Sequence, residues 1–333
     1  MESEQDPVSP VTQVDFVMDT VVEQRLYGQN GQQAADEVSA LLSELENRLS
    51  LYVSNSEIAQ INANAGKGPV SVSQETFDFL ARAKDLSQQS QGLFDITIAP
   101  VSTLWNVTSD TPSVPTQQEI VQAQSLVNWE DLLLDSQNCT AELRYEGQAI
   151  DLGGIAKGYA VDLAWKVYET YQIQSGYLSV GGNILVLGTD PQGGDFSIGI
   201  RDPRGEAKDY LGTIAMPGKI MATTGDYERY FIQDGVRYHH VMDPRTGAPC
   251  QSDLISVSVI GEDGTLCDYL STLLFVAGKE TALQLLDEDA FSLILVDQDH
   301  RVYISPDLKD CFSPVEGSDY TYFYGSDEVS TPS

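Results

Sequence analysis

Residues 151–160, Asp-Leu-Gly-Gly-Ile-Ala-Lys-Gly-Tyr-Ala, combine paired glycines, a carboxylate and a lysine between a predicted strand and a predicted helix. Glycine lets the backbone approach a ligand closely, and the unpaired N–H groups at a helix start attract phosphate. Lys157 would add a positive charge. The spacing fits neither G-x-x-x-x-G-K-[ST] nor G-x-G-x-x-G, so a P-loop and a Rossmann site are not indicated. Taken alone, the segment is equally consistent with a ligand-binding loop and with a structural turn.

Asp268 and Thr272 are four residues apart in a predicted helix, so their side chains share one helix face. A carboxylate and a hydroxyl presented together are hard oxygen ligands of the kind that Mg²⁺ accepts alongside water and substrate phosphates. The pair therefore indicates a possible magnesium site. The alternative interpretation is that Asp268 caps its helix.

Two of the three histidines, His239 and His240, are neighbours just before the turn-forming residues 243–247. Neighbouring side chains on a strand point to opposite faces, so at most one of the two faces a given pocket. A single pocket histidine is more often structural than catalytic unless other chemistry points at it. A second glycine pair, Gly181-Gly182, is consistent with a sheet irregularity or with the wall of a binding site.

Helices and strands are mixed in this chain without strict alternation, which favours an α+β fold over a doubly wound sheet. Residues 31–49 carry apolar side chains at intervals of three and four, typical of an amphipathic helix. Residues 50–62 form an irregular polar stretch in this interpretation. Further helices are predicted over 76–90, 117–126, 156–171, 268–276 and 280–286, and strands over 177–187, 196–200, 210–216, 227–232, 238–242, 254–260, 292–296 and 302–304.

The chain has 333 residues and a formal charge of −32, from 18 Lys and Arg against 50 Asp and Glu. Such a charge repels polyanions at long range, so nucleic acid is not an expected partner. An anionic small ligand can still bind if a divalent metal, local cations and helix N-termini neutralise it. The four cysteines are widely spaced, which indicates neither a zinc site nor a disulfide framework.

Residues 1–10 are polar and lack the basic and apolar regions of a signal peptide. The apolar stretches of the chain are too short to span a bilayer. This polar leader would also suit a tether that remains after an export signal has been removed.

Several motifs in fixed order resemble those of the ApbE-like FAD:protein FMN transferases. They are D-L-G-G-I-A-K-G-Y-A (151–160), S-V-G-G-N (179–183), T-T-G-D-Y-E-R-Y (223–230), H-H-V-M-D-P-R-T-G (239–247) and D-x-x-S-T (268–272). Upstream, residues 18–20, 49–62 and 92–97 with Trp105 resemble further family motifs. The resemblance runs from about Val14 to Ile304, so it covers most of the chain.

The resemblance implies an ApbE-like (T-fold-like) fold of mixed sheets with flanking helices, in which FAD binds in a cleft between two lobes. It predicts a flexible leader over residues 1–13, one two-lobed domain over 14–315, and a C-terminal tail over 316–333.

The resemblance also assigns site residues. Magnesium would be held by the Gly154 carbonyl, the Asp268 carboxylate and the Thr272 hydroxyl, with His240 as catalytic base and Asp268 counted among the catalytic residues. The residues expected to contact FAD are Met18, Tyr52, Leu93, Phe94, Asp95, Asp151, Lys157 and Cys250.

The implied activity is the Mg²⁺-dependent cleavage of FAD, with attachment of FMN through its phosphate to a Ser or Thr of another protein and release of AMP. Expected acceptors carry a D-x-x-S/T motif in membrane redox subunits or extracytoplasmic flavoproteins. The expected location is extracytoplasmic, with the full-length protein anchored as a membrane lipoprotein. The alternatives are an FAD pyrophosphatase and a non-catalytic flavin-binding protein. This chain departs from the family pattern at Asp19, where Gly is usual, and at Asn55, where Asp is usual.

Overall fold

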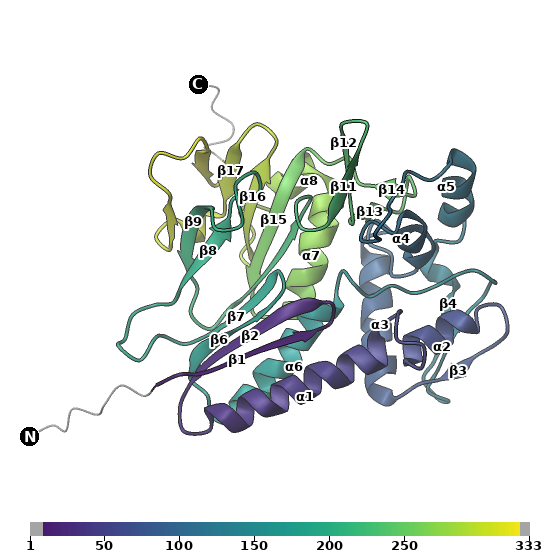
Figure 1. The fold of residues 1–333 in the computed structure, drawn as a ribbon, viewed down its shortest axis with the longest axis horizontal. Coiled ribbons are helices and arrows are strands. Elements are labelled where there is room, and N and C mark those ends of the chain that lie inside the picture. Colours follow the sequence, from purple (N-terminus) through teal and green to yellow (C-terminus); the bar gives the residue numbers. More distant parts are fainter. Residues whose placement is uncertain (1–8, 327–333) are drawn as a thin grey trace, which may run out of the picture.

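A nine-stranded sheet forms the centre of the molecule in the computed structural model, which describes residues 9–326 (Figure 1). Neighbouring strands are antiparallel, except that β17 and β19 are parallel. The spatial order is β1 (Val11–Val17), β2 (Thr20–Tyr27), β6 (Ser175–Val180), β7 (Asn183–Leu187), β10 (Ile220–Gly225), β15 (Leu254–Gly261), β16 (Ser292–Asp297), β17 (Arg301–Ile304) and β19 (Thr321–Tyr324).

Three long helices, α1 (Gly31–Leu49), α6 (Ala156–Thr170) and α7 (Gly264–Ala277), cover one face of this sheet. In α1 the buried residues include Ala34, Val38, Leu42 and Leu45, which recur at three- and four-residue intervals and so form one apolar stripe. These side chains join those of α6, α7 and the sheet in the largest hydrophobic core. Burial of this stripe is what fixes α6 and α7 against the strands.

A small sheet of β8 (Ser197–Arg201), β9 (Tyr210–Ala215) and β18 (Phe312–Pro314) packs on the other side of the main sheet. Alternation along the strands explains the two layers, because neighbouring side chains of a strand point to opposite faces. In β15, for example, Val259 belongs to the helix-side core and Ile260 to the core shared with the small sheet.

The remaining elements form a third region, on the right of Figure 1. Within this region, Trp105 contacts two distant segments: its indole stacks near Tyr238, and its Nε1–H donates to the Gly247 carbonyl at 2.8 Å. The elements are α2 (Glu57–Ala63), α3 (Gln74–Gln89), α4 (Ala99–Trp105), α5 (Gln117–Gln124), the short helix η1 (Trp129–Asp131), and strands β3 (Val70–Ser71), β4 (Leu132–Asp135), β5 (Thr140–Leu143), β11 (Tyr230–Gln233), β12 (Val236–His239), β13 (Met242–Asp243) and β14 (Ala248–Pro249). The helix α8 (Lys279–Gln284) follows α7, and the short helix η2 (Pro306–Leu308) follows β17.

The predicted α+β class with mixed sheets and flanking helices is confirmed. Three local predictions were wrong. The strand expected immediately before the glycine loop, over 149–152, is reduced to an isolated bridge between Ala149 and Ile98. The supposedly irregular stretch 50–62 contains helix α2, whose N-terminus is capped by the Ser56 hydroxyl. The single strand expected over 177–187 is a hairpin, with Gly181-Gly182 as its two-residue turn between paired Val180 and Asn183.

Both predicted ends of the domain were also wrong where the structure describes them. Strand β1 begins at Val11, inside the expected leader, and pairs along its length with β2. Strand β19 lies inside the expected tail and adds to the main sheet beside β17. Residues 1–8 and 327–333 lie outside the described residues. Within residues 9–326, none of the helices combines the length and the apolar character needed to cross a lipid bilayer.

Candidate active site

The N-terminus of α6 meets the middle of α7 through an unusually close contact. A Cβ added at Gly158 would lie 2.1 Å from the Gly264 carbonyl oxygen and 2.7 Å from the Asp268 Cβ, so only glycine fits there. This proximity allows the Gly158 N–H to donate to the Asp268 Oδ2 at 2.8 Å. The glycine therefore positions the carboxylate of Asp268 at the start of α6.

A reciprocal carboxylate comes from α6 itself. The side chain of Asp162 accepts hydrogen bonds from the Gly264 N–H at 2.6 Å and from the Thr265 N–H at 2.9 Å, at the N-terminus of α7. Each helix thus provides an anion to the unpaired N–H groups and positive dipole end of the other. Burial raises the pKa of Asp162, while its hydrogen bonds to Thr265 and Gly264 oppose that change. These reciprocal hydrogen bonds fix the register between α6 and α7.

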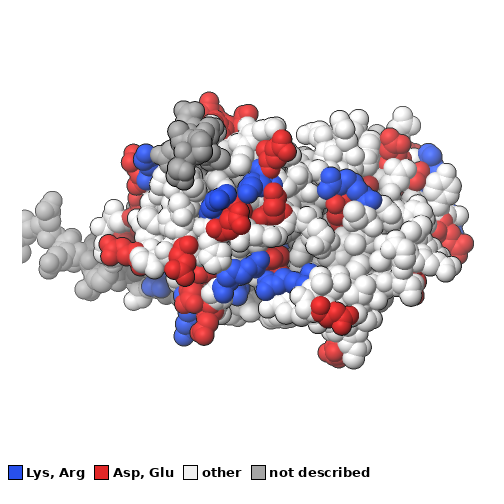
Figure 2. Space-filling model, turned by 90° about the horizontal axis from the view of Figure 1, so that it is seen from above, with Lys and Arg blue, Asp and Glu red and all other residues white. Residues whose placement is uncertain are grey.

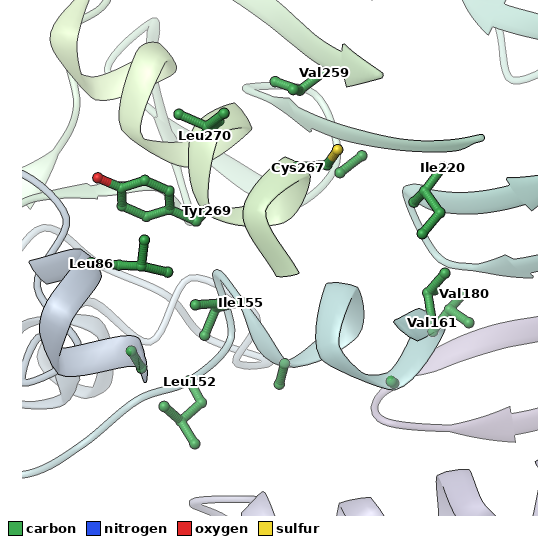
Figure 3. Close-up of a cluster of buried hydrophobic side chains, with 14 of the residues drawn as sticks. Leu86, Leu152, Ile155, Val161, Val180, Ile220, Val259, Cys267, Tyr269 and Leu270 are labelled. Carbon is green, nitrogen blue, oxygen red and sulfur yellow. The ribbon is translucent and has the colours of Figure 1, made fainter. Parts of the chain in front are cut away.

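Apolar side chains anchor the glycine loop from below. Figure 3 shows Leu152 and Ile155, on either side of the glycine pair, in the same buried cluster as Leu86 and Tyr269. Both loop residues are at most 3% exposed. Burial of these two apolar side chains therefore helps to hold the loop in place.

Gly154 lies just before Ile155, the N-cap residue of α6, so its carbonyl is outside the helical hydrogen bonds. The Gly158 N–H, in the first turn of the helix, donates to Asp268. Within residues 9–326, no hydrogen bond reaches the Gly154 oxygen. Thr272 lies close by, since its Oγ1 is 3.4 Å from the position of a Cβ added at Gly154. Its hydroxyl also lies 3.3 Å from the Thr224 hydroxyl of β10.

Asp268 carries a buried negative charge without a cationic partner. Its residue is 4% exposed, and no ion pair to it is found in the part of the chain that the structure describes. A buried carboxylate of this kind requires compensation. Gly154 lies beside Thr272, and Asp268 lies one helical turn before Thr272. A carbonyl, a carboxylate and a hydroxyl are hard oxygen ligands of the kind that could hold a divalent cation such as Mg²⁺. Residues 9–326 contain no cluster of three or more His, Cys, Asp and Glu side chains, so this set has only one charged ligand.

The two adjacent histidines point in different directions, as expected for a strand. His239 is 5% exposed, and its Nε2 lies 2.8 Å from the Cys250 carbonyl while its Nδ1 accepts from the Val241 N–H at 3.3 Å. Because a carbonyl can only accept, the proton of His239 is on Nε2. His239 is therefore a structural residue.

His240 is exposed to solvent, and its Nδ1 lies 3.3 Å from the Arg229 carbonyl. This contact places the proton on Nδ1 and leaves Nε2 as the acceptor. The protein around the ring, followed by the positive charge of Lys157, lowers the pKa of His240. With its pKa lowered, the imidazole is neutral at pH 7 and can act as a base.

Met18, Tyr52 and Asp151, three residues expected to contact FAD, lie around the same space. Met18 packs partly against the main core at the tip of the β1–β2 hairpin. Tyr52 is 76% exposed, and surrounding protein followed by the charges of Asp151 and Asp19 raises its pKa. Asp151 accepts from the Ser102 hydroxyl at 2.8 Å. Lys157 donates to the Gly153 carbonyl at 3.3 Å, so its charge lies over the glycine loop.

Phe94 and Leu93 also border the loop. The Cε2 of Phe94 lies 3.1 Å from the position of a Cβ added at Gly154, and its ring packs edge-on against Tyr269. Leu93 is half-buried against the main core. Phe94 therefore closes one side of the space above Gly154.

Asp95 and Cys250 have internal roles. Asp95 is 7% exposed, and its carboxylate accepts from the N–H and hydroxyl of Thr97 and from the Trp129 N–H. The Cys250 thiol is 3% exposed and faces the Phe275 and Val276 carbonyls; burial raises its pKa to about 12. Their predicted contacts with FAD stay predictions, and the geometry leaves only their backbones for such contacts.

Arg229 was assigned no role from the sequence, although it lies within the T-T-G-D-Y-E-R-Y motif. It contributes to a cavity of about 340 Å³, which it lines together with residues 107–109, Pro112 and residues 228–231. A second cavity of about 410 Å³ lies behind His239, beside Arg204 and Arg237. Both arginines approach the carboxylate of Asp226. Figure 2 shows a similar pairing of charges on one face of the molecule, where many basic side chains lie beside acidic ones.

Comparisons with known proteins identify the family of this chain. A family profile described as "ApbE family" matches residues 18–295. An FAD:protein FMN transferase of Klebsiella pneumoniae (strain 342) is 32% identical over 283 residues, covering 85% of this chain and 88% of that protein.

Solved structures agree as well. The crystal structure of an ApbE protein from Thermotoga maritima has a TM-score of 0.83 at 31% identity and covers 91% of this chain and 99% of its own. The flavin transferase ApbE from Vibrio cholerae has a TM-score of 0.81 at 26% identity, with coverage of 92% and 100%. The family profile over most of the chain, the 32% identical relative and the shared fold together show that this chain belongs to the ApbE family.

Proposed function

We propose that this protein is a Mg²⁺-dependent FAD:protein FMN transferase, which attaches FMN through a phosphoester to Ser or Thr of acceptor proteins and releases AMP. The observation that carries the proposal is the buried carboxylate of Asp268, which has a hydrogen bond from the Gly158 N–H but no cationic partner among the described residues, one helical turn from Thr272, which lies beside Gly154. The relatives named FAD:protein FMN transferase support it.

Gly154, Asp268 and Thr272 would hold the cation, which when bound neutralises the diphosphate and polarises the bond to be broken. Lys157 adds a positive charge over the loop, and the N-terminal N–H groups of α6 favour phosphate. Phe94 restricts the space above Gly154 from one side. These residues bind and orient the diphosphate.

His240 then acts on the acceptor. A Ser or Thr hydroxyl is a weak nucleophile at neutral pH and needs a base within hydrogen-bond reach. The Nε2 of His240 takes the hydroxyl proton as the oxygen bonds to the phosphorus of FMN, and the phosphorus–oxygen bond to AMP breaks. Because the Arg229 carbonyl holds Nδ1, the ring presents Nε2 for this transfer. The products are the FMN phosphoester and AMP.

Hydrolysis of FAD to FMN and AMP is the competing reaction, because His240 is exposed and can activate water in the same way. The departure at Asn55 is a second reason to measure both reactions. Asn55 lies just before the cap of α2, where its carbonyl accepts from the Gln60 side chain.

The acceptor and the location belong to the same proposal. The expected acceptors are proteins with a D-x-x-S/T motif, such as membrane redox subunits or extracytoplasmic flavoproteins, and the full-length protein is expected at the extracytoplasmic side of the membrane as a lipoprotein. Resemblance to the family supports both. Cell fractionation tests the proposed location, since recovery of the full-length protein in the cytoplasmic fraction would contradict it.

The decisive experiment incubates the protein with FAD, Mg²⁺ and a panel of D-x-x-S/T peptides, each paired with a Ser/Thr→Ala control peptide. Mass spectrometry should detect the FMN adduct only on hydroxyl-containing peptides, and chromatography should detect equal AMP. AMP without any adduct across the panel would favour the pyrophosphatase, and neither product would favour a flavin-binding protein.

A further inference from the structure

The tip of the β1–β2 hairpin is built from two residues in the left-handed backbone conformation. Met18 and Asp19 have φ values of 55° and 56° and connect the paired residues Val17 and Thr20. Such two-residue turns favour Asn and Gly, and other residues carry strain there.

Asp19 holds Arg229 at two points. One guanidinium nitrogen of Arg229 donates to the Asp19 carboxylate at 2.6 Å, and the other donates to the Asp19 backbone carbonyl at 2.6 Å. The two residues are 210 positions apart in the sequence. The contact therefore joins the hairpin that carries Met18 to the segment between β10 and β11.

Arg229 in turn holds His240. The Arg229 carbonyl lies 3.0 Å from the His240 backbone nitrogen and 3.3 Å from its Nδ1. Both the position of the histidine backbone and the rotation of its ring thus depend on where residue 229 lies. Arg229 also lines the 340 Å³ cavity, so a guanidinium released from Asp19 has space to move into.

Stability is a poor explanation for this pair. The side chains of Asp19 and Arg229 are 67% and 41% exposed, and exposed ion pairs contribute little to folding. The turn that carries Asp19 is at the same time strained, and strain of this kind collects at functional sites. An arrangement that adds little stability but fixes the position of a reactive group is typical of a positioning contact.

We propose that Asp19 is a positioning residue, which acts through Arg229 to orient His240 for proton transfer. The inference rests on the proposed function in that His240 is the base. The N–H and carbonyl contacts make a continuous chain of three residues, from the hairpin tip through Arg229 to the imidazole. A glycine at position 19 could not make the carboxylate contact with Arg229, so the Asp19 side chain adds a constraint on the position of the base.

The test compares Asp19→Gly, which suits the turn but removes the carboxylate, with Asp19→Asn, whose amide oxygen can still accept from Arg229. We expect Asp19→Gly to lower kcat about tenfold, with the KM for FAD changed less than twofold and the Tm no lower than that of the unaltered protein. Asp19→Asn should retain at least half of kcat. Arg229→Met, which removes the donors, should match Asp19→Gly, and the double variant should fall no further, because both changes break one link.

Gln172→Gly is the matched control, since Gln172 is an exposed residue with φ 58° at the far end of α6. It should leave kcat unchanged. An activity-independent readout is the ¹⁵N chemical shift of the His240 ring: the unaltered protein should show the Nδ1–H tautomer and Asp19→Gly a mixture. If AMP release and transfer both fail in the unaltered protein, the proposed function fails, while the tautomer measurement still tests the link. Unchanged kcat and tautomer in Asp19→Gly, or equal damage in Asp19→Asn, would overturn the inference.

Discussion

Replacement of Gly158 by alanine should separate α6 from α7 and remove Asp268 from its place. The added Cβ would be 2.1 Å from the Gly264 carbonyl oxygen, and backbone cannot yield as a flexible side chain does. Ordinary contact between such atoms needs roughly 3.2 Å or more, so the helices must move apart by about 1 Å. A shift of that size breaks the 2.8 Å hydrogen bond from the Gly158 N–H to Asp268.

Two costs combine in the free energy of unfolding. Overpacking of a close contact costs about 1–3 kcal/mol, and loss of a buried hydrogen bond to a charged group costs about 1.5–3 kcal/mol. The better helix propensity of alanine returns up to about 1 kcal/mol. We therefore expect a loss of about 3 kcal/mol. Activity should fall about a hundredfold, because misplacement of a catalytic group by about 1 Å has that effect.

The assay is urea unfolding followed by circular dichroism, together with AMP release from FAD. Gly31→Ala is the control, since its Cβ would meet the flexible side chain of Val11 at 3.2 Å and no backbone atom closer than 3.6 Å. It should change the free energy of unfolding by less than about 1 kcal/mol. If Gly158→Ala had the stability and activity of the unaltered protein, the account of the helix contact would be refuted.

Three further predictions follow. Asp268→Asn removes an unpaired buried charge yet keeps an acceptor for the Gly158 N–H; AMP release in a Mg²⁺ titration should fall at least about a hundredfold without loss of Tm, and normal turnover would contradict the site. The lowered pKa of His240 keeps it unprotonated in mild acid, so kcat/KM should hold as the pH falls below about 6.5; an acid limb at or above that pH would be inconsistent. Burial raises the pKa of Asp297, but hydrogen bonds from Lys279, the Arg301 N–H and Tyr303 outweigh it and lower the pKa. The hydrogen bonds of Asp297 stabilise the folded protein above the pKa that this carboxyl has in the unfolded chain, and the stabilisation disappears as the pH falls through its pKa in the folded protein. Lys279→Met should therefore lower the free energy of unfolding by about 2 kcal/mol at pH 7 and by progressively less below about pH 4. Urea unfolding at each pH measures this; an equal cost at pH 3 would refute the assignment.

Sequence patterns succeeded where one element determines its own form. The apolar periodicity of 31–49 predicted α1, and the spacing of Asp268 and Thr272 placed both on one helix face. Helix α2 was missed because its apolar residues, Ile58 and Ile61, are too few to form a clear stripe, although Ser56 followed by Glu57 is a usable capping signal.

The features that the sequence patterns did not predict depend on contacts between distant segments. The strand β10 was missed because Ala222, Thr223 and Thr224 have no clear alternation, and only burial between β7 and β15 makes this segment a strand. The meeting of Gly154 with Thr272, and of Asp19 with Arg229, requires the fold. Motif resemblance supplied the residues of the site, while their hydrogen-bond partners came from the structure.

The proposed mechanism requires the divalent cation to bind at Gly154, Asp268 and Thr272. Crystals grown with FAD and Mn²⁺, a substitute for Mg²⁺ with a strong anomalous signal, test it directly. We expect one anomalous peak within about 2.0–2.4 Å of the Gly154 carbonyl, the Asp268 carboxylate and the Thr272 hydroxyl, next to the diphosphate. A peak elsewhere, or FAD bound with no peak at these three groups, would contradict it.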